Sequence, residues 1–253
     1  MTLRYRPRPS PLPWFHRWCT NLLQTPGFAL TTILCGTLSL ITSLWDKGGS
    51  QQHAIAQTWA RISLAISGSH TQILGKQNLG KFPVAVYISN HTSYMDTPVI
   101  FASLPFQFRI LAKSGLWKVP FIGWHLNRSG QLPIDISNPR ATIASLGNAV
   151  RALKSGMSVF VFPEGGRTED GTLKPFLSGA AFLAIRAGVP IVPMALHGVR
   201  DLLPMGSHHY YPNLLTLSVG EPISTAGLSI READHLTERV RQQVLCLYDA
   251  IQH

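Results

Sequence analysis

Charged residues are scarce in this sequence. They make up 13% of its 253 residues, and only 12 of them are acidic. The 22 lysines and arginines give a formal net charge of +10, yet they are not gathered in dense runs. Nucleic-acid binders usually contain such runs, so we expect no nucleic-acid partner. A thinly charged, basic and rather apolar chain is better suited to an anionic membrane surface and to phosphate-bearing substrates.

Cysteine is rare as well. Cys19, Cys35 and Cys246 lie far apart and form neither a C-x-x-C pair nor a metal-ligand pattern. We interpret them as ordinary buried or membrane-facing thiols, and we expect no bound metal. The G-x-S-x-G pattern that carries the nucleophilic serine of many hydrolases does not occur either.

The N-terminal 20 residues are rich in proline and arginine, and no acidic residue precedes Asp46. Trp14, Phe15 and Trp18 lie among these charges, as aromatic residues do at a membrane interface. Residues 27–45 carry no charge and are nearly long enough to cross the hydrocarbon layer as a helix. We therefore expect a basic tail that rests on an anionic leaflet, followed by a membrane-associated helix. A cleaved signal peptide fits less well, because the basic segment is long and rich in proline.

A glycine-rich turn over residues 46–50 leads to a second predicted helix over residues 53–67. Its apolar residues recur at helical spacing along one face: Ile55, Trp59, Ile62 and Ile66. Two helices joined by such a turn are typical of a helical hairpin. We assign the tail and this hairpin to residues 1–70.

From Val84 onward, short apolar strands alternate with helical stretches. This alternation is typical of an α/β domain with a mostly parallel mixed sheet flanked by helices, which we assign to residues 71–253. We expect strands near residues 84–88, 106–111, 130–135, 157–162, 191–196 and 214–219. We expect helices near residues 120–126, 138–154 and 178–187, and a last amphipathic helix from residue 231. The helix over residues 138–154 should begin at Asn138 and Pro139, and its predicted buried side is formed by Ile143, Leu146, Val150 and Leu153. We interpret the apolar stripe of the last helix as core packing rather than a partner site; it comprises Leu236, Val240, Val244, Leu247 and Ile251.

Residues 84–88 predict a buried strand that the polar residues Asn90 and His91 bring to an end. Ser93 and Asp96 then have the spacing of a capping box that opens a helix. With Ser93 as the N-cap, the Asp96 carboxylate can reach the His91 imidazole, hold one ring nitrogen protonated and leave the other free as a base. The same residues also fit a simple helix cap and a turn histidine bonded to the backbone.

A second polar group follows the strand predicted over residues 157–162, at the carboxyl end where ligands bind in open α/β sheets. Arg167 has a planar fork that bonds two phosphate oxygens at once, and Gly165 and Gly166 permit close approach of the backbone. Glu164 is placed either to orient Arg167 or to bind an acceptor hydroxyl. A turn with an exposed Glu–Arg pair is the plainer alternative.

Four blocks in this order make the sequence resemble the glycerolipid acyltransferase family, typified by 1-acylglycerol-3-phosphate O-acyltransferases. The family pattern N-H-x-x-x-x-D occurs at residues 90–96, F-P-E-G-x-R at residues 162–167 and V-P-I-V-P at residues 189–193. Between the first two lies K-x-x-L-x-x-x-P-x-x-G, which begins at Lys113 and ends at Gly123. The resemblance implies a phosphate contact for Lys113, although a solvated lysine at a strand end fits nearly as well. It implies a tight helix corner at Gly123.

The resemblance also implies that residues 71–253 are an O-acyltransferase catalytic domain. In it His91, oriented by Asp96, would take the proton from the free hydroxyl of lysophosphatidic acid as that hydroxyl attacks an acyl thioester, so that phosphatidic acid forms. The implied partners are membrane lipids, the lysophospholipid acceptor and an acyl donor, which is acyl-CoA or acyl carrier protein, and no cofactor is needed. Because cytosolic donors must reach the site, we predict that the hairpin dips into one leaflet. The tail and the domain would then share the cytoplasmic face of the inner or cell membrane.

Three departures from the family pattern bear on the acceptor. Gly166 stands where threonine is usual, Asp135 is followed by Ile136 where many members have arginine, and residues 176–180 lack the lysines of the family's F-K-K-G-A segment. Because cations are missing, another lysolipid acceptor is an alternative. A lipid hydrolase or thioesterase is a second alternative that lacks an evident nucleophile. A non-enzymatic membrane-binding module is a third, and the intact motif residues argue against it.

Overall fold

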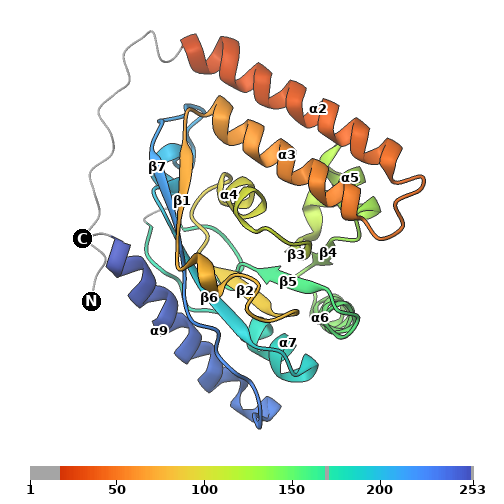
Figure 1. The fold of residues 1–253 in the computed structure, drawn as a ribbon, viewed down its shortest axis with the longest axis vertical. Coiled ribbons are helices and arrows are strands. Elements are labelled where there is room, and N and C mark those ends of the chain that lie inside the picture. Colours follow the sequence, from red (N-terminus) through yellow and green to blue (C-terminus); the bar gives the residue numbers. More distant parts are fainter. Residues whose placement is uncertain (1–17, 169–170, 252–253) are drawn as a thin grey trace.

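The computed structural model describes residues 18–168 and 171–251. Of the predicted basic tail only its last residues, including Trp18, belong to this part of the chain, so Trp14 and Phe15 lie outside the described residues. In Figure 1 a sheet runs through the middle of the molecule, and a pair of long helices, α2 and α3, lies above it.

Seven strands of the described chain form one sheet in the order β1-β7-β6-β2-β5-β3-β4. The strands are β1 (His70–Leu74), β2 (Val86–Ser89), β3 (Phe108–Lys113), β4 (Leu132–Ile134), β5 (Ser158–Val161), β6 (Ile191–His197) and β7 (Leu214–Val219). All neighbouring pairs are parallel except β6 and β7. The predicted mostly parallel mixed sheet is confirmed. Strand β1 was not predicted, because this edge strand has little apolar character and alternates only between exposed and half-buried residues.

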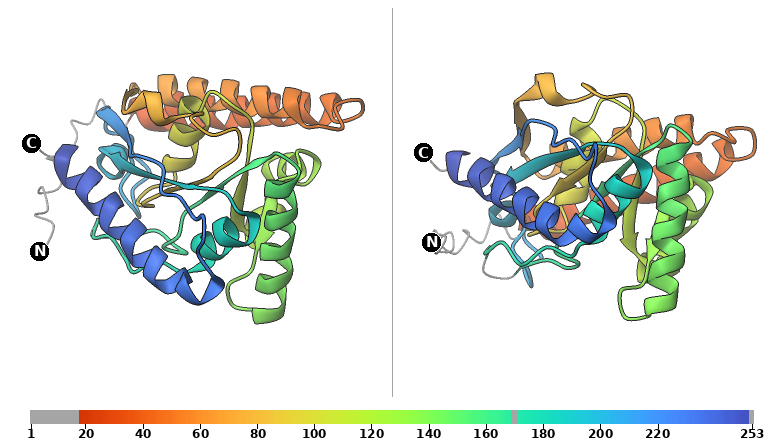
Figure 2. Two further views of the ribbon diagram at one scale, coloured as in Figure 1. Left: turned by 60° about the horizontal axis from the view of Figure 1, so that its bottom comes forward. Right: turned by 90° about the horizontal axis from the view of Figure 1, so that it is seen from below.

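Helices cover both faces of the sheet. The helices are α2 (Thr25–Thr42), α3 (Ser50–Ile66), α4 (Asp96–Ser103), α5 (Ile122–Arg128), α6 (Pro139–Lys154), α7 (Gly179–Ala187), α8 (Val199–Leu202) and α9 (Ala233–Ile251). Figures 1 and 2 show α3 and α4 on one face and α6, α7 and α9 on the other. Strand alternation fills both layers, because Tyr87 joins the core beside α4 while Val86 and Ile88 join the core beneath α6, α7 and α9.

The predicted helix boundaries hold where the capping chemistry is local. Helix α6 begins at Pro139, and the side chain of the preceding Asn138 accepts a hydrogen bond from the Ala141 amide. Ile143, which was predicted on the buried side of this helix, is 72% exposed, so that prediction was wrong. The apolar stripe of α9 is confirmed as core packing, with Leu236, Val240 and Val244 buried.

The N-terminal hairpin is confirmed. A short π-helix, Thr20–Gln24, leads into α2, and the Asp46 carboxylate in the following turn accepts the amides of Ser50, Gln51 and Gln52. This cap starts α3 three residues before the predicted position, at Ser50. The predicted stripe of α3 faces α2, where the Trp59 indole N–H donates to the Thr32 hydroxyl over 3.0 Å.

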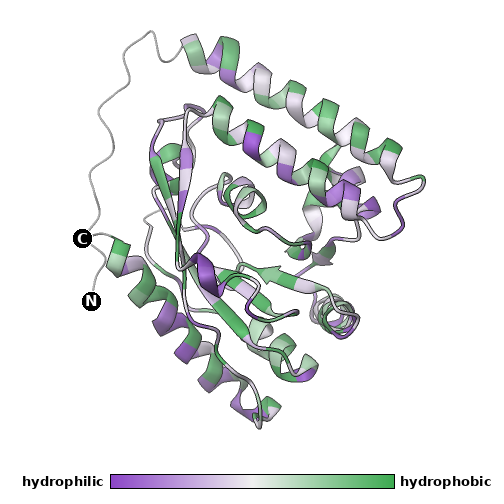
Figure 3. Ribbon diagram, in the orientation of Figure 1, coloured by the Kyte–Doolittle hydropathy of each residue, from purple (hydrophilic) through white to green (hydrophobic). Residues whose placement is uncertain are grey.

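Helix α3 is held between α2 and the α/β domain. Its small and apolar residues Ala56, Ala60 and Leu64 belong to the same core as α4. The helix Thr20–Thr42 is the one among the described residues that is long and apolar enough to cross a membrane, and only 17% of its apolar window is buried. Its exposed apolar residues include Leu30, Ile33, Leu34, Leu38 and Ile41. Figure 3 shows this apolar character along α2.

Candidate active site

The candidate site lies at the carboxyl edge of the parallel strands. The Asn90 side chain fixes this edge, because its amide donates to the Leu196 carbonyl over 3.0 Å and its oxygen accepts the Leu196 amide over 2.7 Å. The ends of β2 and β6 are therefore joined just before His91. From the sequence, Asn90 was predicted to end a strand and to begin the N-H-x-x-x-x-D motif, and no bridge to another strand was expected. An amide side chain, which both donates and accepts, was the available signal for such a bridge.

His91 and Asp96 are in direct contact. His91 Nδ1 lies 2.8 Å from Asp96 Oδ2, which also accepts the amides of Thr92 at 2.6 Å and Ser93 at 2.8 Å. Asp96 is fully buried, whereas the His91 side chain is 19% exposed. An ionised carboxylate only accepts hydrogen bonds, so Nδ1 carries the proton and Nε2 keeps its lone pair. This arrangement leaves Nε2 as a base that a ligand can reach.

The predicted capping role of Ser93 is wrong. Helix α4 begins at Asp96, and the preceding residue, Met95, makes no side-chain cap. The Ser93 hydroxyl instead donates to the Leu203 carbonyl over 2.9 Å. The Asp96 carboxylate accepts the amides of Thr92 and Ser93, and the Ser93 hydroxyl accepts only the Met95 amide, over 3.3 Å, within the turn. The hydroxyl therefore joins this turn to the segment after α8 and does not cap the helix.

Phe162 packs flat on the His91 ring, with centroids 4.0 Å apart and an angle of 14° between the planes. The contact limits rotation of the imidazole and so helps to fix the direction of Nε2. Phe162 was not singled out from the sequence. The two-residue period of strands offered a signal, because Phe162 continues the alternation of Phe160 just past the end of β5, and His91 continues that of Tyr87 just past the end of β2.

Glu164 joins the two motif loops. Its carboxylate accepts the His91 amide over 2.6 Å and the Lys174 amide over 3.0 Å. Burial raises the pKa of Glu164 to about 7, although these two backbone hydrogen bonds act in the opposite direction. Within the described residues Glu164 forms no hydrogen bond or ion pair with Arg167, so a direct orienting contact is not seen, and the binding of an acceptor hydroxyl stays a prediction. Glu164 positions the His91 backbone.

Glu164→Gln is expected to change the pH dependence of stability. The folded-state pKa of about 7 lies above the ordinary value of 4.5, so the contribution of Glu164 is full below that ordinary value and is lost as pH rises through 7. Between pH 5 and 8 the wild type should therefore lose stability relative to the glutamine variant, by at most about 3 kcal/mol. Urea unfolding at both pH values measures this. Glu238→Gln, at an exposed carboxylate, is the control that should show no such change, and parallel pH dependences of wild type and Glu164→Gln would contradict the prediction.

Arg167 reaches the turn that carries His91. Its guanidinium carbon lies 3.4 Å from the centroid of the Tyr94 ring, and its Nη1 is buried without a hydrogen-bond partner. The backbone supports this position, because the Thr168 amide donates to the His91 carbonyl over 3.1 Å and Lys174 Nζ donates to the Arg167 carbonyl over 2.7 Å. The structure therefore brings Arg167 and the dyad together.

The two glycines of this loop differ. Gly165 has a φ of 69°, and a Cβ added there would lie 2.9 Å from Leu177 Cδ1, so the position requires glycine. A Cβ on Gly166 would meet no atom within 4 Å. A threonine would therefore find room for its Cβ at position 166, so a lack of space does not explain why this chain has glycine where the family usually has threonine.

The second family block is only partly joined to the site. Gly123 makes the tight corner that the resemblance implies, since an added Cβ would lie 2.2 Å from the Trp117 carbonyl oxygen. Lys113 ends β3 at the same edge of the sheet and is exposed. The pKa of Asp135 is lowered mainly by hydrogen bonds from Ser137, and the charge of Lys113 makes a smaller contribution in the same direction. Within the described residues Lys113 forms no hydrogen bond or ion pair with the dyad or the Glu164–Arg167 loop, so its phosphate contact stays a prediction.

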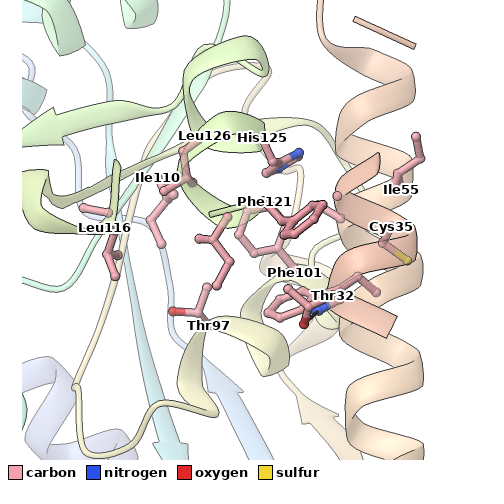
Figure 4. A pocket seen from close by; sticks show the side chains of 15 residues that line it. Thr32, Cys35, Ile55, Thr97, Phe101, Ile110, Leu116, Phe121, His125 and Leu126 are labelled. Carbon is pink, nitrogen blue, oxygen red and sulfur yellow. Dashed lines mark hydrogen bonds between the residues drawn. The ribbon is translucent and has the colours of Figure 1, made fainter. Parts of the chain in front are cut away.

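An apolar cavity lies between the hairpin and the α/β domain. Figure 4 shows side chains that line it, from Cys35 on α2 and Ile55 on α3 to Phe101 on α4 and Leu116 after β3. Thr97, the residue after Asp96, is also part of the lining. The cavity therefore extends from the hairpin to Thr97 in the first turn of α4, the helix that begins at Asp96.

A free imidazole nitrogen backed by a carboxylate, at the carboxyl edge of an α/β sheet and next to an arginine, defines a class of proteins suited to taking a proton from a bound hydroxyl. The comparisons with known proteins agree. Residues 70–197 match the family described as Acyltransferase, which is half of the chain. The chain belongs to this acyltransferase family.

Individual relatives point the same way. The chain is 38% identical over 156 residues to a chloroplastic 1-acyl-sn-glycerol-3-phosphate acyltransferase of Brassica napus. The match covers 61% of this chain and 45% of that enzyme, so the chain spans less than half the length of this relative. An enzyme of the same name from Chlamydomonas reinhardtii is 32% identical over 91% of this chain and 67% of its own length. The crystal structure of the LPA acyltransferase PlsC from Thermotoga maritima superposes with a TM-score of 0.74 at 25% identity, covering 91% of this chain and 97% of that one.

Proposed function

We propose that this protein transfers an acyl chain from an acyl thioester, acyl-CoA or acyl carrier protein, to the free hydroxyl of lysophosphatidic acid and so forms phosphatidic acid. The contact between His91 Nδ1 and Asp96 Oδ2 carries the proposal, because it leaves Nε2 as a base next to Arg167. The names of the related enzymes support the choice of acceptor.

The reaction follows from the dyad. His91 Nε2 takes the proton of the acceptor hydroxyl while that oxygen attacks the thioester carbonyl, so a C–O bond forms. The tetrahedral intermediate then expels the thiolate by breaking the C–S bond, and the proton on His91 passes to the leaving sulfur. The buried Asp96 carboxylate stabilises the transient imidazolium. The two amides on its Oδ2 hold it in place.

Both substrates have suitable surroundings. Arg167 offers a cation for the acceptor phosphate, and its buried Nη1 is a donor that a phosphate oxygen would satisfy. The apolar cavity beside Thr97 suits an acyl chain, because its lining is almost free of polar groups. A hydrolase with Ser93 as nucleophile is less well supported, since the Ser93 hydroxyl is bonded to the Leu203 carbonyl rather than to His91.

A panel of lysolipids tests the proposal. Purified protein is given one radiolabelled acyl-CoA with lysophosphatidic acid, lysophosphatidylcholine, lysophosphatidylglycerol or monoacylglycerol, and the labelled lipids are separated. We expect labelled phosphatidic acid as the main product. A different main product would show that another lysolipid is the preferred acceptor. Release of free fatty acid alone would favour the hydrolase. Acyl carrier protein replaces CoA in a parallel series.

We also propose that the hairpin lies in one leaflet, with the domain on the cytoplasmic face. Replacing Leu34 and Leu38, which are 59% and 50% exposed on α2, by glutamate should lower binding to vesicles of anionic lipid by at least about tenfold, since each buried leucine contributes roughly 1.5–3 kcal/mol. Ile143→Glu is the matched control, because Ile143 is 72% exposed on α6, on the opposite side of the sheet. Equal loss in the control would contradict the membrane face.

The orientation has a separate test. In a background without other cysteines, Lys47→Cys places a thiol in the turn of the hairpin. In sealed membrane vesicles of known orientation this thiol should not react with an impermeant label added on the side opposite to the domain. Labelling from that side would show that α2 spans the bilayer.

A further inference from the structure

Tyr94 has an exposed position that core packing does not explain. Tyr94 is 67% exposed, yet the guanidinium carbon of Arg167 lies over its ring, 3.4 Å from the ring centroid. A cation over the face of an aromatic ring is attracted by the ring quadrupole, and arginine can also stack on the ring with its planar group. The contact between the two motif loops is therefore specific to an aromatic residue at this position.

Stacking leaves the donors of Arg167 available. It occupies the flat face of the guanidinium, whereas the N–H groups point outward in the plane. Nη1 is buried and has no hydrogen-bond partner, and a buried donor without an acceptor is unfavourable. An oxygen of an anionic ligand would remove this penalty. The unpaired donor thus indicates that a ligand completes the group formed by Tyr94 and Arg167.

The turn that carries Tyr94 also carries the base. Asp96 Oδ2 accepts the amides of Thr92 and Ser93 as well as His91 Nδ1, so one buried carboxylate fixes the backbone on both sides of the imidazole. Tyr94 is two residues from Thr92 in this turn. One short segment of chain therefore carries both the base and the ring that contacts the guanidinium.

We propose that Tyr94 is a positioning and specificity-determining residue that holds Arg167 so that its donors meet the phosphate of the acceptor while the acceptor hydroxyl lies at His91. The inference rests on the proposed function, because it assumes a phosphorylated acceptor. An aromatic ring at this position favours phosphorylated over uncharged lysolipids. It does so without touching the reacting atoms.

Steady-state kinetics of Tyr94→Leu, Tyr94→Phe and Tyr94→Trp test this role, with lysophosphatidic acid and monoacylglycerol as acceptors. Tyr94→Leu should raise the KM for lysophosphatidic acid about tenfold, with the loss falling on KM rather than kcat, and should lower the preference for it over monoacylglycerol by a similar factor. Phenylalanine and tryptophan should restore both values to within about threefold, because they keep the aromatic face. Phe82→Leu, at an exposed aromatic residue before β2, is the matched control and should leave the preference unchanged.

A double-mutant cycle separates a specific contact from a general weakening of the turn. In an Arg167→Ala background, Tyr94→Leu should change the preference for lysophosphatidic acid by less than about twofold, because the partner of the ring is gone. An equal effect of Tyr94→Leu in both backgrounds would overturn the proposal. So would a phenylalanine or tryptophan variant as impaired as the leucine variant.

Binding without turnover distinguishes failure of this inference from failure of the proposed function. Calorimetry with a short-chain, water-soluble lysophosphatidic acid and no acyl donor should show affinity about tenfold lower for Tyr94→Leu than for the wild type, and unchanged affinity for the matching monoacylglycerol. Such binding in a protein that forms no phosphatidic acid would refute the proposed reaction alone. Tight, equal binding by wild type and Tyr94→Leu would refute the role of Tyr94 alone.

Discussion

Replacement of His91 by alanine is expected to lower kcat for acyl transfer by about 10²–10⁴-fold, the range that a positioned general base supplies. The variant keeps Asp96 and its bonds to the Thr92 and Ser93 amides, so the turn should stay folded. The KM for lysophosphatidic acid should change little, because the proposed function assigns the phosphate to Arg167 and not to His91. Initial rates with acyl-CoA at saturating acceptor measure this.

His235→Ala is the control for this variant, since His235 is an exposed histidine on α9, far along the chain from the dyad. It should keep wild-type kcat. A His91→Ala protein that retains more than a tenth of wild-type kcat would exclude His91 as the base. A rise in KM with unchanged kcat would assign His91 to binding instead.

Asp96→Asn is expected to lower kcat by about 10³-fold while the protein stays folded. Asp96 Oδ2 accepts all three hydrogen bonds, and Oδ1 is buried without a partner. An asparagine can place its oxygen at the Oδ2 position and its NH₂ at the Oδ1 position, so the geometry of the turn survives. The negative charge that stabilises the imidazolium is lost, and the loss should therefore appear in kcat and not in KM.

Asp96→Ala provides the contrast. It leaves the amides of Thr92 and Ser93 buried without an acceptor, and each such amide costs about 1–3 kcal/mol. Asp96→Asn leaves its NH₂ buried without an acceptor at the Oδ1 position but keeps an acceptor for both amides and for His91 Nδ1. Thermal unfolding should therefore separate the two variants, with Asp96→Ala less stable than Asp96→Asn. Wild-type kcat in Asp96→Asn would contradict the orienting and electrostatic role of the carboxylate.

The fold was largely predictable because its signals are local. The apolar strand β7 was expected at residues 214–219 and occupies them, and Asn138 followed by Pro139 marked the start of α6. Strand β1 was not predicted, because an exposed edge strand needs no apolar pattern. Ile143 was wrongly predicted as buried, because helical spacing shows which residues share a face but not how far the neighbouring layer extends along that face.

The site was predictable in its chemistry and less so in its connections. The contact between His91 and Asp96 follows from a separation of five residues in one turn. The contacts made by Glu164 do not, because they depend on how two loops from different strands meet. Asn90, Phe162 and Tyr94 were missed as partners for the same reason, since each reaches across to another loop or strand. Such contacts come from the order of the strands in the sheet, which short motifs do not encode.

A structure of the protein bound to lysophosphatidic acid in the absence of an acyl donor tests the central claim most directly. We expect the free hydroxyl within about 2.6–3.2 Å of His91 Nε2 and the phosphate on the Arg167 guanidinium. A bound lipid with its hydroxyl remote from the imidazole, or with its phosphate held elsewhere, would contradict the account.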